Sequence, residues 1–160
     1  MLPMMEAFDA RRTTRAFSSE PLFDDLLTSL LWAATGINRS ETGGRTAPSA
    51  HDWQEIDVYA ALSRGLYRYD VPAHALELVA TRDLRRATGL QDYIGDAPLN
   101  LIYVADFTRM TNANAEDRKF FAATDAAAIA ENVYLFCAAT KLATVLRSSI
   151  DRKAFAKLWN

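Results

Sequence analysis

The fold is decided by residues 56–69, which read IDVYAALSRGLYRY. Every second residue of Ile56–Leu62 is apolar, and a period of two is typical of a strand with one buried face. Gly65 turns the chain toward a second run of this kind, and Ala75–Thr81 forms a third. Three short antiparallel strands are therefore predicted in the middle of the chain.

Further along the chain, Leu99–Ala105 (LNLIYVA) is the most continuous apolar run of β type. Such a run is typical of a strand with both faces buried, so we expect it at the centre of the sheet. Asp83 is expected to cap a helix that reaches about Ile94, and Ala143–Leu146 is expected to form another strand.

Helical periodicity marks both ends of the chain. Apolar residues of Leu22–Ala34 recur at intervals of three and four, and Gly36 follows where a capping glycine belongs. A longer helix is predicted over Ala115–Leu142, where alanines on nearly every side would let another backbone approach closely. Shorter helices are predicted over residues 3–10 and Arg152–Trp159. Strands between terminal helices predict an α+β fold, with an antiparallel or mixed sheet covered by helices.

Length and composition define the class of protein. With 160 residues, half of them apolar, the chain is expected to form one domain over residues 1–160. Lys and Arg number 18 against 20 Asp and Glu, so no net charge favours nucleic acid or an anionic membrane as a partner. No segment is expected to approach the roughly 18 apolar residues needed to cross a bilayer. One cysteine and two histidines predict no metal site, and we expect a soluble, cytoplasmic protein.

Two segments carry candidate binding groups. Arg11, Thr13 and Arg15 alternate, so an extended backbone would direct all three toward one side, where they suit an anion of phosphate size. A solvated basic segment would contain the same residues, and the sequence pattern leaves both interpretations open. The loop at residues 38–52 is too long for an ordinary connection, which indicates a binding role or mobility.

Three motifs together resemble the nitroreductase family. They are RRTTRAF at residues 11–17, GGRTAPSAHDWQE at 43–55 and LATVLRSS at 142–149, and their order and separation also match the family. The resemblance extends over essentially the whole chain. It implies an α+β sandwich that forms an intertwined homodimer with FMN at the subunit interface. It also implies an enzyme that passes hydride from NAD(P)H through flavin N5 to a small organic acceptor, such as a nitro compound or a quinone.

The resemblance assigns cofactor-binding roles within the first motif. Arg11 and Arg15 resemble the family's contacts to the FMN phosphate and ring, and Arg12 belongs to the same basic segment. Thr13 stands where the family has a serine and keeps the hydroxyl group. Because the cofactor would carry out the chemistry, no side chain is expected to act as a catalytic nucleophile.

The second motif resembles the loop that covers the isoalloxazine ring from the partner subunit. Pro48, Ser49 and Ala50 belong to that loop by resemblance. Asp52 stands where family members commonly have Asn, and an acid there would oppose the negative charge of reduced flavin.

The third motif resembles the segment whose backbone N–H groups approach flavin N5 and O4. Arg147, Ser148 and Ser149 would stabilise the charge that develops there through their backbone, so the role does not depend on their side chains. The resemblance also places Ala126 and Ile129, on the long helix, at or near the dimer interface.

The sequence stops at Lys157-Leu158-Trp159-Asn160, where family members usually continue with a strand and a basic segment that completes the phosphate site. Loss of a cationic phosphate contact is expected to cost about 1.5–3 kcal/mol, roughly ten- to a hundredfold in affinity. An alternative function is therefore a non-catalytic dimer that binds flavin or another ligand with weakened affinity. A dimeric scaffold of the same fold that binds no flavin is a further alternative.

Overall fold

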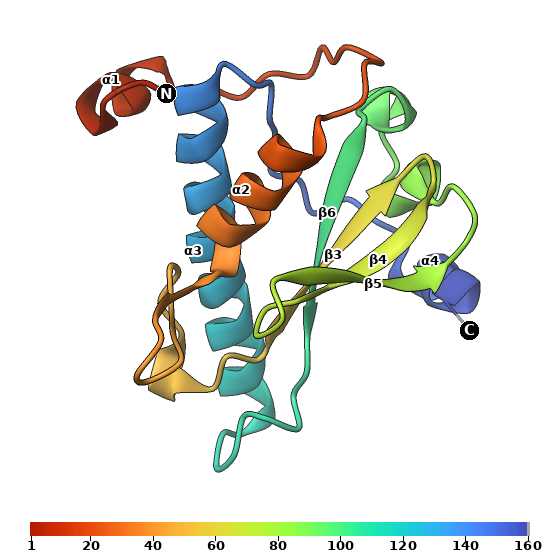
Figure 1. Cartoon of the computed structure of the whole chain (residues 1–160). Coiled ribbons are helices and arrows are strands. Elements are labelled where there is room, and N and C mark those ends of the chain that lie inside the picture. The colour runs from red at the N-terminus through yellow and green to blue at the C-terminus, as the bar shows by residue number, and fades with distance from the viewer. Residues whose placement is uncertain (160) are drawn as a thin grey trace.

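A computed structural model describes residues 1–159, and Asn160 lies outside the described residues. The chain forms an α+β fold in which a four-stranded sheet lies between helical layers, as Figure 1 shows. The helices are α1 (Met4–Ala10), α2 (Asp24–Thr35), α3 (Ala115–Thr140) and α4 (Arg152–Trp159). The sheet contains β3 (Ile56–Leu62), β4 (Gly65–Asp70), β5 (Ala75–Ala80) and β6 (Leu99–Ala105). A small hairpin of β1 (Ile37–Arg39) and β2 (Gly44–Arg45) precedes the sheet, and short 3-10 turns are η1 (Ala50–Asp52), η2 (Arg85–Thr88) and η3 (Asp92–Gly95).

The sheet has the strand order β5-β4-β3-β6, and every neighbouring pair is antiparallel. The three predicted strands are confirmed as β3, β4 and β5. Leu99–Ala105 is confirmed as a strand, but the expectation of a central position is wrong, because β6 pairs only with β3 among the described strands. Its continuous apolar character has another cause: Leu101 and Tyr103 pack on one face of the sheet, whereas Ile102 and Val104 pack on the other.

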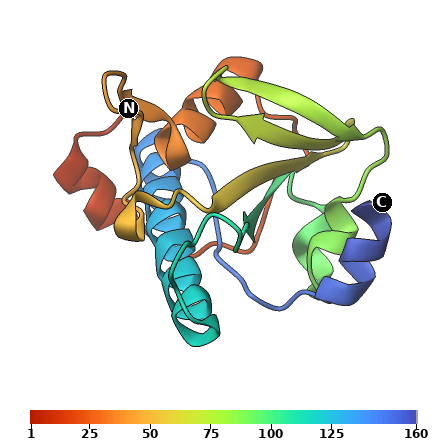
Figure 2. The ribbon, with the colours of Figure 1, turned by 90° about the horizontal axis from the view of Figure 1, so that it is seen from below.

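Two hydrophobic clusters cover the two faces of the sheet, and Figure 2 shows the layers from below. Val58 and Leu62 of β3 face the cluster formed with α2 and α3. Tyr59 and Ala61 face the opposite cluster, which includes Phe155 of α4. The alternation in the sequence thus separates two cores rather than a core and solvent.

Helix α3 is fixed at both ends. The Asn114 side chain accepts hydrogen bonds from the backbone N–H groups of Glu116 and Asp117, both at 2.9 Å, and so caps the first turn. Lys141 adopts the left-handed conformation that ends the helix. By length and composition alone, α3 could cross a membrane, so the expectation that no segment approaches this limit is wrong. In the fold, α3 packs against α1 and α2 and contributes side chains to the core.

Two predicted elements are absent from residues 1–159. The helix expected from Asp83 to about Ile94 is instead η2 and η3, separated at Gly89, where the chain is extended. A Cβ atom at Gly89 would meet the Arg147 guanidinium, so a larger residue there would require this side chain to shift. The strand expected at Ala143–Leu146 is irregular, because its backbone groups bond individually to residues of other segments rather than to a neighbouring strand.

The expected interface residues of α3 face inward. Ile129 is 4% exposed and lies in the core between α2, α3 and the sheet, and its position at or near a dimer interface stays a prediction. Ala126 packs against the same core. The exposed alanines of this helix are Ala115, Ala123 and Ala127.

Leu31→Ala tests the core beneath α3. Leu31 is 2% exposed and belongs to the cluster that joins α2 to α3. We expect the substitution to lower the free energy of unfolding by about 2–5 kcal/mol, because it removes buried methyl groups and leaves a cavity. Denaturant titration measures the effect. Leu90→Ala, at a residue that is 68% exposed, is the control and should change stability by less than about 0.5 kcal/mol.

Candidate functional site

The hydroxyl group of Tyr134 joins two segments that are far apart in the sequence. It lies 3.0 Å from Thr13 Oγ1 and accepts a hydrogen bond from the backbone N–H of Leu146 at 2.8 Å. A second connection runs beside it, since the Thr14 N–H donates to the Thr144 carbonyl at 2.9 Å. The first and third predicted motifs therefore meet on α3.

The arginines of the first motif surround this junction. The Arg11 guanidinium lies over the Tyr134 ring, 5.3 Å from its centroid, which is within cation–π distance. Arg12 and Arg15 are exposed. Across residues 1–159, none of these three guanidinium groups forms an ion pair with a carboxylate, so their charges are available to an anion.

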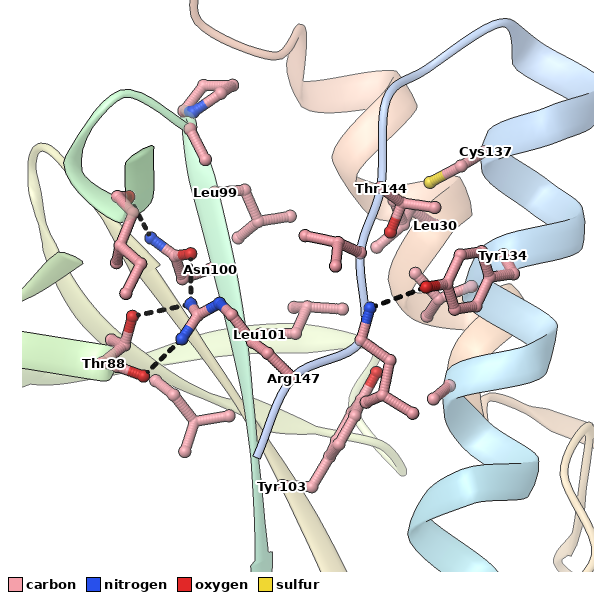
Figure 3. Close-up of a pocket in the computed structure, with 18 of the residues that line it drawn as sticks. Leu30, Thr88, Leu99, Asn100, Leu101, Tyr103, Tyr134, Cys137, Thr144 and Arg147 are labelled. Carbon is pink, nitrogen blue, oxygen red and sulfur yellow. Dashed lines mark hydrogen bonds between the residues drawn. The ribbon is translucent and has the colours of Figure 1, made fainter. Parts of the chain in front are cut away.

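The third motif presents its backbone and its arginine side chain to different partners. Among the described residues, the backbone N–H groups of Arg147, Ser148 and Ser149 donate no hydrogen bond to the protein. The Arg147 guanidinium points away, as Figure 3 shows, and donates to the Thr88 carbonyl at 2.7 Å and to Asn100 Oδ1 at 2.7 Å. Burial lowers the pKa of this guanidinium. Its side chain therefore anchors the segment to η2 and β6, and leaves the backbone N–H groups for other partners.

A cavity of about 1400 Å³ lies beside this segment, between β6, α2 and α3. Its wall is largely apolar and includes the residues labelled in Figure 3, among them Leu30, Leu101, Tyr103 and Cys137. Tyr134, Thr144 and Arg147 are among the polar residues that line it. Pockets for cofactors and small molecules typically measure roughly 300–1,000 Å³, so the cavity has room for a ligand of that size.

The second motif contacts α3 at another level. The Ala50 N–H donates to Asp125 Oδ2 at 2.8 Å, and Asp125 precedes Tyr134 by nine residues, roughly 13 Å along the helix. Pro48 is exposed, and Ser49 and Ala50 are half-buried. Within one chain, the loop is therefore not brought together with the first and third motifs.

The polar side chains of this loop are held by their neighbours. The Ser49 hydroxyl accepts from the Gln54 N–H at 2.8 Å and donates to Glu55 Oε2 at 3.3 Å. Asp52 Oδ1 accepts from Gln54 Nε2 at 2.9 Å. Asp52 has a positive φ of 54°. Ser49 and Asp52 thus shape the loop, and its exposed residues are Pro48, His51 and Asp52.

Sequence reasoning missed four residues that organise the site. Two of them lie on α3: Tyr134 contacts Thr13, and Asp125 accepts the Ala50 N–H. The other two are Glu55, which accepts the Ser49 hydroxyl, and Asn100, which accepts a hydrogen bond from the Arg147 guanidinium. A polar residue at a helix position where the pattern calls for an apolar one could have indicated such a residue from the sequence. Asp125 carries this signal, because it lies on the buried face of a helix rich in alanine.

Comparison with known proteins gives consistent matches. The family model described as the nitroreductase family matches residues 9–160. A candidate nitroreductase of Methanocaldococcus jannaschii is 28% identical over 145 residues, which cover 84% of this chain and 73% of that protein. The crystal structure of a candidate nitroreductase from Ralstonia eutropha JMP134 has a TM-score of 0.94 and 47% identity, covering 99% of this chain and 75% of that chain. A candidate nitroreductase from Desulfovibrio desulfuricans, solved in complex with FMN, has a TM-score of 0.66 at 20% identity, covering 100% and 78%, which shows similarity of fold.

Tyr134→Phe tests the junction between the first and third motifs. The substitution removes the acceptor of the part-buried Leu146 N–H, so we expect the free energy of unfolding to fall by about 0.5–1.5 kcal/mol. Denaturant titration measures this loss. Tyr103→Phe is the matched control in the same cavity, and an equal loss in that variant would contradict the role of the Tyr134 hydroxyl.

Proposed function

Because the chain belongs to the nitroreductase family, we propose that it is an FMN-dependent oxidoreductase that transfers reducing equivalents from NAD(P)H to a small organic acceptor, such as a nitro compound or a quinone. The observation that carries this proposal is the junction at Tyr134. It joins the two motifs to which the resemblance assigns the cofactor phosphate and the reactive part of the ring.

The charge and hydrogen-bonding capacity at this junction fit a flavin mononucleotide. Arg11, Arg12 and Arg15 supply cationic groups without carboxylate partners in the described chain, and an arginine fork suits a phosphate dianion. Thr13 supplies a hydroxyl group beside them. The large, mostly apolar cavity next to Leu146 suits a planar aromatic ring system.

Bound FMN would supply hydride transfer at its N5 atom, and the protein would provide position and electrostatics. The unpaired N–H groups of Arg147, Ser148 and Ser149 are the donors that would stabilise negative charge on the ring. The Arg147 side chain holds this backbone in place through Thr88 and Asn100. No nucleophilic side chain is needed, which is consistent with Cys137, whose pKa is raised by burial to about 12.

We infer that the working form is a homodimer of one nitroreductase-like domain per chain, over residues 1–160. The inference is supported by the second motif, which lies away from the junction in its own chain and could serve a site in a second copy. The apolar side chains Met4, Met5 and Phe8 on α1 are exposed, as is Ala127 on α3. Burial of these surfaces between copies would stabilise such a dimer. We further infer a cytoplasmic location, which the unpaired, buried thiol of Cys137 supports.

An absorbance experiment tests the function. The purified protein is incubated with FMN, freed of excess cofactor, and then mixed with NADPH or NADH without oxygen. Retained flavin that loses its colour would support the oxidoreductase. Retained flavin that neither nucleotide reduces would support the non-catalytic binding protein, and failure to retain FMN would contradict both functions.

Arg15→Met tests the phosphate contact. Because the substitution removes a cation but keeps much of the side-chain length, we expect the Kd for FMN to rise about ten- to a hundredfold, equivalent to about 1.5–3 kcal/mol. Fluorescence titration with FMN measures the Kd. Arg64→Met, which removes an exposed arginine paired with Asp24 outside the junction, should leave the Kd unchanged. An equal effect of the two variants would contradict a specific contact at Arg15.

A further inference from the structure

Two carboxyl groups face one another in the interior beneath the second motif. Glu55, just before β3, is 0% exposed, and Asp125, in the middle of α3, is 6% exposed. Both residues line the same small cavity, of about 20 Å³. Neither forms an ion pair with a lysine or arginine in the part of the chain that the structure describes.

The loop is attached to both carboxyl groups. Asp125 Oδ2 accepts the Ala50 N–H at 2.8 Å, and Glu55 Oε2 accepts the Ser49 hydroxyl at 3.3 Å. Glu55 Oε1 is buried and receives no hydrogen bond from the protein. Among the four oxygens of Glu55 and Asp125, Glu55 Oε1 is thus a buried polar atom without a hydrogen-bond partner in the protein.

A single proton on this pair of acids would remove the repulsion between two buried carboxylates. Two ionised carboxylates in contact in the interior would combine the cost of burial with mutual repulsion. Burial and the adjacent Asp125 both raise the pKa of Glu55. A proton on Glu55 Oε1 turns the unpartnered oxygen into a donor toward Asp125, and Asp125 keeps its acceptor for the Ala50 N–H.

The surrounding charged groups are paired elsewhere. Arg45 lines the same small cavity, of about 20 Å³, but donates to Gln54 Oε1 and to the Thr35 carbonyl. Arg109 forms an ion pair with Asp57 at 2.8 Å and donates to the Gln54 carbonyl.

The remaining titratable groups of the loop also point to other partners. Asp52 accepts from Gln54, and the imidazole of His51 stacks on Trp53 with ring centroids 4.5 Å apart. Glu55 and Asp125 therefore line one cavity without an ion-pair partner among the described residues, and a proton is the simplest counter-charge.

We propose that Glu55 and Asp125 share one proton, and that this proton fastens the loop Pro48–Asp52 to α3, so that both acids are positioning residues for the loop. The effect on flavin binding rests on the proposed function, because that function assigns the loop to the cofactor site. The fastening itself is independent of any cofactor.

The proposal determines how loop opening depends on pH. In the open loop Glu55 has its ordinary pKa of 4.5, and in the closed loop its pKa is raised. Protons thus favour the closed state, and the fastening is complete below the ordinary pKa. As the pH rises, the opening constant should increase about tenfold per pH unit until the raised pKa is reached, and stay constant above it.

Glu55→Gln is the decisive variant, since an amide donates to Asp125 but does not ionise. Hydrogen exchange of the peptide that contains Ala50 is measured without flavin from about pH 5 upward, and each variant is compared with wild type at the same pH. At the acidic end of the range, we expect the Ala50 peptide to be equally protected from exchange in wild type and in Glu55→Gln. As the pH rises, the protection should fall progressively in wild type alone. Glu77→Gln, which removes an exposed carboxylate paired with Arg68, should behave as wild type.

Infrared spectroscopy of the folded protein gives a second measurement, independent of the loop. At the acidic end of the same pH range, wild type should show a protonated carboxyl band that is missing in Glu55→Gln. Absence of this band, or the same pH-dependent loss of protection in Glu55→Gln, would overturn the proposal even if FMN binds. If FMN does not bind but both signatures appear, the proposed function fails and the shared proton stands.

Discussion

The position of every predicted flavin motif depends on hydrogen bonds to one helix. On α3, Tyr134 holds the segments around Thr13 and Leu146, and Asp125 holds Ala50. These contacts require that two polar side chains be buried on a helix otherwise packed with apolar residues, which is tolerated only because both are hydrogen-bonded. The sequence of α3 must therefore satisfy packing and polar contacts at the same time, and a shift of one residue would break both.

Much of the fold could be predicted because it follows from local periodicity. The apolar patterns of α2 and β3 have periods that match their structures, and the long alanine-rich run of α3 is typical of a helix, so each could be recognised without knowledge of partners. Prediction failed where a distant residue decides the local structure. The chain at Gly89 lies against the distant Arg147 side chain, and residues 143–146 are irregular because their backbone bonds to Tyr134 and Thr14.

The residue types of the site could be predicted from the sequence. The contacts that support these residues could not. Arginines near the start of the chain and a Pro-Ser-Ala loop are visible in the sequence, because their chemistry belongs to the residues themselves. Glu55 and Asp125 are 70 positions apart in the sequence, and neither acid is distinctive by its local sequence. Only the fold places them in a shared environment. Ile129 illustrates the same limit, since an apolar residue on an alanine-rich helix fits an interface and a core equally well, and only packing distinguishes them.

The edge position of β6 has a consequence for how the protein behaves in concentrated solution. Its residues carry no charge and no proline, and the outer row of backbone groups has no strand partner in residues 1–159. An apolar edge of this kind is a template on which another extended chain can add, and it favours aggregation when it is uncovered. Pro98 and Asp106 border the strand and limit such growth at its two ends. Whatever surface covers β6 therefore protects the protein from self-association as well as completing its sheet.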